Sequence, residues 1–293
     1  MERISCTSVA TGSYGTSSRD TRLTELNLNA IASENTKKSV LIEILRKVIA
    51  LGMYGVLLSV PVAQADASPP NGVESAAPEQ WAFKLTPSYY VTTHQVDATD
   101  LNLRTNYGPH AIWIGHYQRG SDFEQTRTGY EYTAQLPWVQ LVPSLQLATH
   151  GFAGGSLNAQ IGDSVYGLLG FGRTNLHDFY NLNFDPNDSI VYGIGTRLLP
   201  KSTLALFTVK DNRLHTGQIV THVVWRMIPS EGQRLTVDLS SKHGRPTAEE
   251  DSVSGMALSL TYDYRDFFVR LAQDQKVNFS NEDQTRLSLG VRF

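Results

Sequence analysis

In the last nine residues of the sequence, 285–293, apolar side chains take every second position from Leu287 to the end. These side chains are Leu287, Leu289, Val291 and Phe293, and arginine, serine and glycine stand between them. Successive side chains of a β-strand point to opposite faces, so this segment is a strand with one apolar and one polar face. The closing strand of a membrane barrel has this pattern, with the apolar face on lipid and the polar face on the lumen.

Composition excludes several other classes of protein. Hydrophobic residues make up 41% of the sequence, which is too few for a helical membrane protein, and 25 Lys+Arg stand against 28 Asp+Glu. The one cysteine, Cys6, lies in a segment that we expect to be removed, so a mature chain has no thiol for disulfides, catalysis or metal binding. We find no phosphate loop, His/Cys cluster or nucleic-acid motif, and we expect neither a cofactor nor a nucleic-acid partner.

A secretory signal peptide is predicted over residues 37–65. Basic pairs at 37–38 and 46–47 precede an apolar run over 48–60, which is followed by Ala63-Gln64-Ala65, a cleavage site of small residues before Asp66. A single membrane anchor is the alternative, but the run has about 13 residues and a spanning helix needs roughly 20.

The remaining boundaries follow from composition. Residues 1–36 are rich in Ser, Thr and Asn and lack periodicity, which indicates either an incorrectly assigned start codon or a disordered cytoplasmic extension. Residues 66–80 are rich in Pro, Ala, Ser and Glu and are expected to be a disordered lead-in. The barrel itself is expected over 81–293.

From Trp81 onward, short alternating segments separated by turn residues predict an all-β fold of about twelve strands. The predicted strands span 81–92, 109–118, 123–136, 139–150, 156–172, 187–199, 202–213, 216–228, 232–243, 253–264, 267–278 and 284–293. An even number of strands returns the C-terminus to the side where the first strand begins. Such a sheet must close on itself to leave no backbone group unpaired in lipid.

The connections between these strands alternate in length. One set is short, at 119–122, 151–155, 199–201, 229–231 and 265–266, and most of the other set is longer, at 94–108, 173–186, 244–252 and 279–283. Outer-membrane barrels have short periplasmic turns and long external loops, so the sequence predicts a transmembrane antiparallel up-and-down β-barrel. A soluble β-sandwich or lipocalin-like barrel, with an apolar inside and a polar outside, is the alternative. Girdle aromatics are expected near strand ends at Tyr130, Tyr132, Trp138, Trp225, Tyr262, Tyr264 and Phe293.

The C-terminal strand resembles that of bacterial outer-membrane barrels, which commonly ends in phenylalanine and is read by the insertion machinery. The resemblance implies a location in the bacterial outer membrane, with Phe293 as the insertion signal. It also implies outer-membrane lipid, lipopolysaccharide and the insertion machinery as partners. In size and predicted strand number the chain is similar to the oligogalacturonate- and sialic-acid-type porins, which are twelve-stranded with arginine-lined lumens. Likeness of architecture does not fix a function.

With the apolar faces on lipid, the predicted lumen is basic although the chain from Asp66 onward is acidic. The basic residues assigned to it are Lys84, Arg127, Arg197, Arg226, Arg234, Lys242, Arg270, Lys276, Arg286 and Arg292, and the acidic ones are Glu131, Asp238, Asp263 and Asp274. Such a lining concentrates anions, which predicts a narrow channel for small anionic solutes. The alternative is a filled structural barrel, in which Asp238 pairs with Arg226 or Arg234 and Asp274 pairs with Arg270 or Lys276.

Two further features bear on function. The loop 177–188 is a candidate ligand or constriction element, because His177, Asp178, Tyr180, Asp185 and Asp188 offer oxygen ligands and an aromatic surface, although its spacing is not an EF-hand and Asx-turns explain it as well. Outer-membrane lipid hydrolases and deacylases typically show His-x-Ser, and none of the eight histidines has serine two residues later. A triad assembled from separate strands, for example around His215 or His177, stays open, so an enzyme is an alternative.

Overall fold

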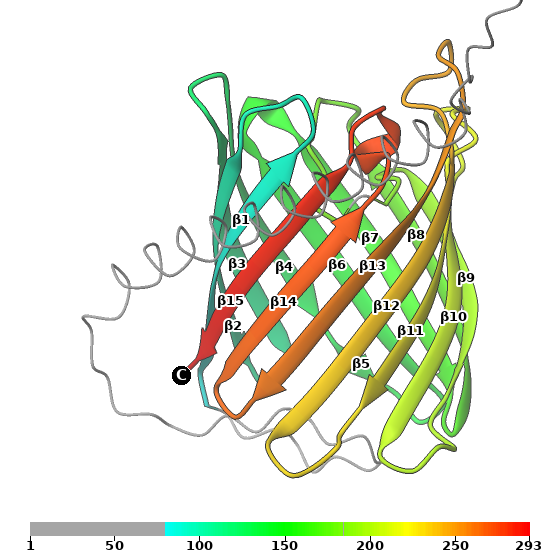
Figure 1. The fold of residues 1–293 in the computed structure, drawn as a ribbon. Helices are drawn as coiled ribbons and strands as arrows, with labels where there is room; N and C mark the ends of the chain where they lie inside the picture. Colours follow the sequence, from blue (N-terminus) through cyan, green and yellow to red (C-terminus); the bar gives the residue numbers. More distant parts are fainter. Residues whose placement is uncertain (1–79, 184) are drawn as a thin grey trace, which may run out of the picture. The chain divides into compact units, whose positions relative to one another are not determined.

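The structure of the protein is a computed structural model that describes residues 80–183 and 185–293 (Figure 1). The expectations for 1–36, for the signal peptide at 37–65 and, apart from Gln80, for the lead-in at 66–80 lie outside the described residues. The strands are β1 (Ala82–Thr92), β2 (Ala98–Tyr107), β3 (His110–Arg119), β4 (Phe123–Tyr132), β5 (Ala134–Gln135), β6 (Val139–Ala148), β7 (Ala153–Gly162), β8 (Val165–Thr174), β9 (Ser189–Thr196), β10 (Ser202–Asp211), β11 (Ile219–Met227), β12 (Gln233–Gly244), β13 (Val253–Tyr264), β14 (Phe267–Asp274) and β15 (Gln284–Arg292).

Fourteen of these strands form a closed antiparallel barrel. Neighbours in sequence pair with each other, β4 pairs with β6, and β1 pairs with β15 to close the ring. The two-residue β5 lies beside the ring and pairs with β6 just past the end of β4. Closure leaves no free sheet edge, as a sheet in lipid requires.

The barrel has more strands than the twelve expected from the sequence. Residues 98–107, expected to be loop, form β2, whose alternation is weak because Thr99 and Thr105 share the outward face with its two leucines. The expected strand over 156–172 is in fact parts of β7 and β8, which are joined by a tight turn after Gly162 (φ 106°). Only glycine adopts that backbone conformation easily, so the chain reverses there without a long polar loop to mark it.

The connections lie at two ends of the barrel, which we call the C-terminal end, where Phe293 lies, and the loop end. The C-terminal end holds 108–109, 133–138, 163–164, 197–201, 228–232 and 265–266, and the loop end holds 93–97, 120–122, 149–152, 175–188, 212–218, 245–252 and 275–283. The turns at 119–122 and 151–155 were expected on the same side as the other short turns, and this expectation is wrong. The extra strands shift them to the loop end.

The outward face of the barrel is apolar. Leu235 and Tyr262, and Leu239 and Leu258, face each other across β12 and β13 and are exposed or half-buried. The expected girdle aromatics point outward near the C-terminal end, and Trp138 is 84% exposed. An apolar outside and a polar inside are the arrangement of a membrane-spanning barrel and the reverse of a soluble one. The described part of the chain contains no helix long and apolar enough to cross a membrane.

Large inward-facing aromatic side chains lie over glycines of the neighbouring strand. Phe268 of β14 covers Gly290 of β15, and Trp113 of β3 covers Gly129 of β4. A side chain at either glycine would meet the ring, so these pairs fill parts of the wall while keeping strand register.

Two neighbouring loops at the loop end are joined by Glu282. Its carboxylate accepts a hydrogen bond from the Thr93 hydroxyl (2.5 Å) and contacts His94 Nδ1 (3.1 Å). The hydrogen bond from Thr93 is the largest cause of a lowered pKa at the Glu282 carboxyl, and the contact with His94 lowers this pKa further. A carboxyl with a lowered pKa in the folded state stabilises the fold above its unfolded pKa of about 4.3, and this stabilisation is lost as pH falls through the lowered pKa.

We therefore expect the contact between these two loops to weaken only below about pH 4. The amide of Thr93, which donates to the carbonyl of Asp283 at 2.9 Å, reports this contact by hydrogen exchange. Its protection should fall below about pH 4 in the native protein. The same acid-dependent step should be absent in Glu282→Gln, and an identical step in both proteins would contradict the assignment to Glu282.

Candidate functional site: the lumen and the loop folded into it

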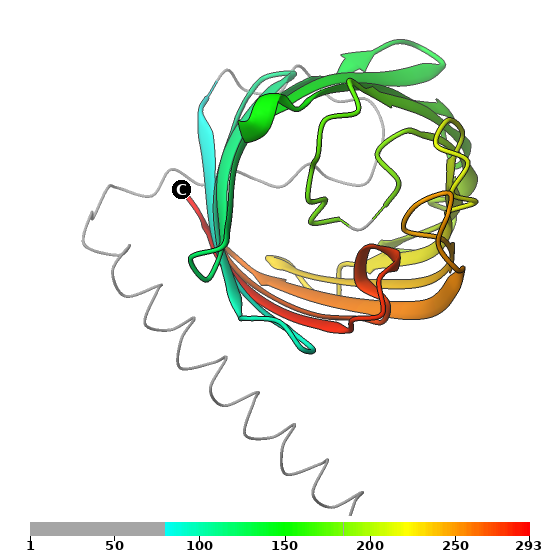
Figure 2. The same ribbon diagram turned by 90° about the horizontal axis from the view of Figure 1, so that it is seen from above.

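The loop 175–188 between β8 and β9 folds into the lumen. Seen from above, its chain runs inside the ring of strands (Figure 2). Its contacts reach β3, β4 and β15 in one direction and β11 in the other. We call residues 175–188 the inward loop. Two separate parts of the wall hold this loop inside the ring, and the loop therefore narrows the lumen.

Gln125 of β4 fixes the backbone of the inward loop at Tyr180. The Tyr180 N–H donates to Gln125 Oε1 (2.9 Å), and Gln125 Nε2 donates to the Tyr180 carbonyl (3.0 Å). The Gln125 side chain is 2% exposed, so both hydrogen bonds are protected from water. A buried amide that satisfies both backbone groups of one residue is a specific anchor, because losing it leaves both unpaired.

The same part of the loop packs on an aromatic surface of the wall. The Tyr180 ring stacks on Tyr117 of β3 at 5.1 Å, and Leu182 lies in a buried cluster with Tyr90, Ala98 and Tyr117. The loop also receives polar contacts from β15, where Gln284 Nε2 donates to the Tyr180 hydroxyl (3.2 Å) and Arg286 Nη1 donates to the Leu182 carbonyl (3.3 Å).

A histidine ties the other side of the inward loop to β11 and β12. His222 Nε2 contacts Asp185 Oδ1 of the loop at 3.1 Å, and Nδ1 contacts Asp238 Oδ1 at 3.0 Å. Its ring stacks on Phe207 at 4.8 Å. Two ionised carboxylates only accept, so an imidazole that satisfies both must carry a proton on each nitrogen. His222 therefore acts as a cation between two anions.

All inward-facing carboxylates of the described strands except Asp211 are paired with cations of the wall, and Asp211 accepts from backbone N–H groups and the Thr216 hydroxyl. Arg127 donates to Asp100 at 2.8 Å, and the remaining pairs are Arg104 with Glu131, Arg234 and Arg292 with Asp263, His222 with Asp238, and Lys242 with Asp274. The partners expected from sequence for Asp238 and Asp274 are therefore wrong. Lys242 reaches Asp274 of β14 because small residues of β13, Gly255 and Ala257, lie between them.

Five inward-facing cations have no carboxylate partner in the part of the chain that the structure describes. They are Lys84, Arg119, Arg226, Arg270 and Arg286. Arg226 faces inward, opposite Thr203 and Thr236, and is exposed. Asn158, midway along β7, also points inward and is exposed, so water reaches the middle of the lumen. The lumen therefore carries uncompensated positive charge next to water.

The other residues proposed from the sequence are placed as follows. Eight of the ten basic residues assigned to the lumen face inward on strands. Arg197 instead lies in the turn after β9 and donates to the Asp163 carbonyl (2.6 Å), and Lys276 lies in the loop after β14 and donates to the Asn281 carbonyl (3.2 Å). Within the inward loop, His177 and Asp178 are exposed, whereas Tyr180, Asp185 and Asp188 are engaged with the protein.

Sequence reasoning missed several lumen residues, among them Arg119, which was assigned to a turn, and Gln125. Asp100 and Arg104 were assigned to a loop together with the rest of β2, and His222 was noted only as a polar residue opposite an apolar face. The alternating pattern of residues 98–107, although weak, is the feature that could have placed Asp100 and Arg104 on the inward face of a strand. The role of His222 depends on Asp185, which is distant in sequence, and no local pattern reveals it.

The residues considered for a metal site or a catalytic triad are placed as follows in the structure. Residues 80–183 and 185–293 contain no group of three or more His, Cys, Asp or Glu placed to hold a metal ion. Of the two histidines considered for a triad, His215 is exposed in the loop after β10, and His177 is exposed in the inward loop. His243 Nδ1 contacts Ser254 Oγ at 2.9 Å on the outward face, but no carboxylate contact of His243 occurs among these residues.

Comparisons with known proteins concern the fold alone. No protein-family model and no curated protein sequence matches the chain. Similar solved structures include the Acinetobacter baumannii outer membrane protein Omp33 (8% identity, TM-score 0.48, 73% of this chain and 99% of that chain). They also include a KdgM porin (8%, 0.42, 72% and 99%) and a NanC porin (9%, 0.42, 71% and 98%). The closed ring of this chain, with its apolar outside and polar inside, has by itself the architecture of a membrane-spanning antiparallel β-barrel.

Proposed function

We propose that the protein is a passive outer-membrane channel for small anionic solutes, with the inward loop as its constriction. The observation that carries this proposal is the charge balance of the lumen. Five of the carboxylates on its strands are engaged by a cation, and Asp211 accepts only from backbone N–H groups and the Thr216 hydroxyl. In contrast, the described residues give no carboxylate partner to Lys84, Arg119, Arg226, Arg270 and Arg286. A wall with unpaired cations and low-dielectric surroundings raises the local concentration of anions.

The positions of these cations suit a path rather than a single site. Lys84 and Arg226 lie near the C-terminal end, Arg270 lies farther along β14, and Arg286 lies beside the inward loop. An anion that moves from one end to the other therefore passes successive positive groups. Conduction requires that an ion binds well enough to enter the pore but not so tightly at one site that it cannot leave. A series of separate positive groups meets both requirements.

The location follows from the same physical argument as the fold. A closed sheet with an apolar outer face is stable in lipid, and β-barrels of this kind span bacterial outer membranes. The four longest connections of the described barrel, 175–188, 212–218, 245–252 and 275–283, all lie at the loop end, which supports a periplasmic C-terminal end and an external loop end. The barrel insertion machinery, which reads a terminal strand such as the one ending at Phe293, is a partner in this proposal.

Solute uptake into liposomes tests the proposed function. The purified full chain, reconstituted into liposomes, should admit a small monovalent carboxylate faster than a neutral sugar of equal size and much faster than an amine cation. Faster entry of the cation would contradict an anion channel. Equal impermeability to all three would instead support a filled structural barrel.

A further inference from the structure

A groove on the outward face of the barrel has an apolar floor and a basic residue, Arg173, toward the loop end of the barrel. It has a volume of about 470 Å³, and its walls include Leu145, Leu157 and Phe171 of β6, β7 and β8. Gly155 lies between Leu145 and Arg173 in register, and its missing side chain gives the groove its depth. Lipid chains are as apolar as this floor, so apolar contact alone does not favour one lipid over another. The groove can accept a chain that fits its shape, and a preference for one kind of lipid must come from charge.

Arg173 supplies positive charge at the loop end of this groove. Its guanidinium lies 4.2 Å over the Phe171 ring and donates to Asn212 Oδ1 (2.5 Å) and to the Gly172 carbonyl. The nearest carboxylate, Asp188, is 4.0 Å away and is already engaged at 2.5 Å by Arg213. Two guanidinium groups therefore share one carboxylate, and the group as a whole keeps a positive charge.

Lys210 supplies a second positive charge two strands farther round the barrel. It lies in register with Ile190, which in turn faces Phe171, so an outward row runs Phe171, Ile190, Lys210. Lys210 is exposed, and its ammonium group has no hydrogen bond or ion pair with the described residues.

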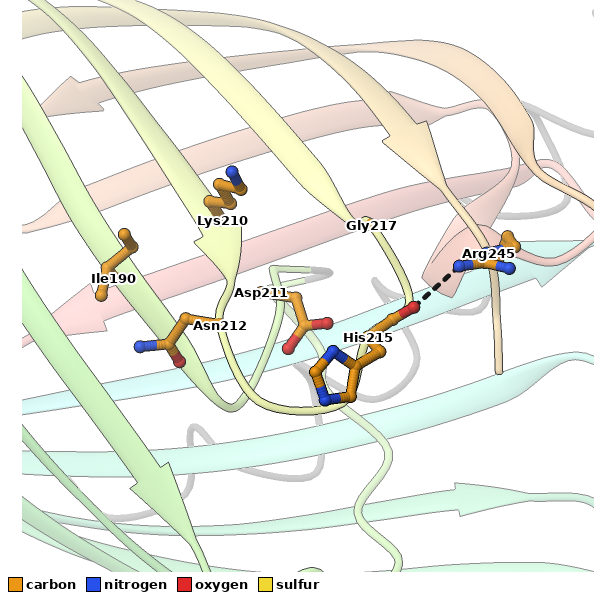
Figure 3. Close-up of a pocket in the computed structure, with 7 residues that line it drawn as sticks. All are labelled: Ile190, Lys210, Asp211, Asn212, His215, Gly217 and Arg245. Atoms are coloured by element: carbon orange, nitrogen blue, oxygen red, sulfur yellow. Dashed lines mark hydrogen bonds between the residues drawn. The ribbon is translucent and has the colours of Figure 1, made fainter. Parts of the chain in front are cut away.

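Lys210 and Ile190 also line a second pocket of about 390 Å³ on the same side of the barrel (Figure 3). The other cation there, Arg245, uses Nε, Nη1 and Nη2 to donate to the backbone carbonyls of Thr216, Ala248 and His215, which leaves it few donors for a ligand. The acidic residues Glu249, Glu250 and Asp251 belong to the loop after β12. The free positive charge of this surface therefore comes from β8 and β10.

We infer that Arg173, Lys210 and the Gly155 groove form a binding site for a phosphorylated glycolipid of the outer leaflet. One acyl chain lies in the groove against Leu145, Leu157 and Phe171, and phosphate groups contact Arg173 and Lys210. Arginine favours phosphate because its planar donors match the phosphate oxygens, and lysine adds a mobile point charge. The inference rests on the proposed outer-membrane orientation, in which the loop end faces the leaflet that holds such lipids.

Native mass spectrometry of the full chain in detergent tests this site, with diphosphoryl lipid A as the probe. The native protein should retain this lipid, and Lys210→Glu should weaken retention by about tenfold or more, as expected for the loss of one charge-assisted contact. Lys210 has no protein partner, so this variant should fold normally. Gly155→Leu, which fills the groove, should weaken retention as well.

A control with the same loss of charge is Lys201→Gln with Arg265→Gln, since both residues lie in turns at the C-terminal end. This control should bind diphosphoryl lipid A like the native protein. Equal retention by Lys210→Glu and the native protein would overturn the inference, and so would equal retention of lipid A without phosphates. Equal retention of phosphatidylglycerol would show an unselective anionic surface and would also overturn it. This experiment measures bound lipid and does not depend on ion flow. A negative result would therefore overturn the lipid site without overturning the proposed channel.

Discussion

Replacing Lys84, Arg226 and Arg270 together with glutamine should reduce the preference of the channel for anions by about tenfold, the lower limit of the concentrating effect of a charged cleft. These residues are three of the five lumen cations that have no carboxylate partner among the described residues, so none of them holds a carboxylate of the wall. Their loss therefore removes charge and leaves the ion pairs intact. The ratio of chloride to potassium permeability in planar bilayers measures the effect.

The double variant Lys201→Gln with Arg265→Gln is the control for this experiment as well. It removes positive charge from turns at the C-terminal end and leaves the lumen strands unchanged. Its permeability ratio should equal that of the native channel. If the triple lumen variant also kept the native ratio, the unpaired cations would not set selectivity.

Replacing Gln125 with leucine should release the inward loop and raise the single-channel conductance. The change removes both hydrogen bonds to the Tyr180 backbone and leaves a buried N–H and a buried carbonyl unpaired, at a cost of about 2 kcal/mol or more. The loop keeps its second attachment at His222, so we expect a wider and noisier channel rather than an unfolded barrel. Single-channel recording measures both the mean current and its fluctuation.

Gln140→Leu is the matched control for the loop. Gln140 of β6 also faces inward, but its side chain donates to Gln135 (3.1 Å) near the C-terminal end and does not touch the inward loop. Conductance of this variant should stay at the native level. A Gln125→Leu channel with native conductance would show that the inward loop is not the constriction.

The C-terminal half of the fold could be predicted from its sequence because its two faces differ strongly. In β13, Met256, Leu258 and Leu260 face outward, and small or charged residues face inward, so the alternation gives both the strand and its orientation. The same parity places Arg226, Arg270 and Arg286 on the inward face. β2 was missed because threonines on its outward face reduce that contrast.

The contacts of the inward loop could not be predicted in the same way. Tyr180 meets Gln284 because closure of β15 on β1 brings the end of the chain beside β2 and β3. His222 meets Asp185 because the loop turns inward, and no spacing in the sequence encodes that direction. A composition rich in Asp, Asn and aromatics marked the loop as unusual, but which partners it meets depends on the closed ring.

The reversal potential of the native channel tests the central proposal most directly. The full chain, purified and inserted into a planar bilayer under a KCl gradient, should give a reversal potential of the sign set by chloride. This result follows from a lumen in which five inward-facing cations have no carboxylate partner among the described residues. A reversal potential of the sign set by potassium, or the absence of any channel current, would contradict the proposal.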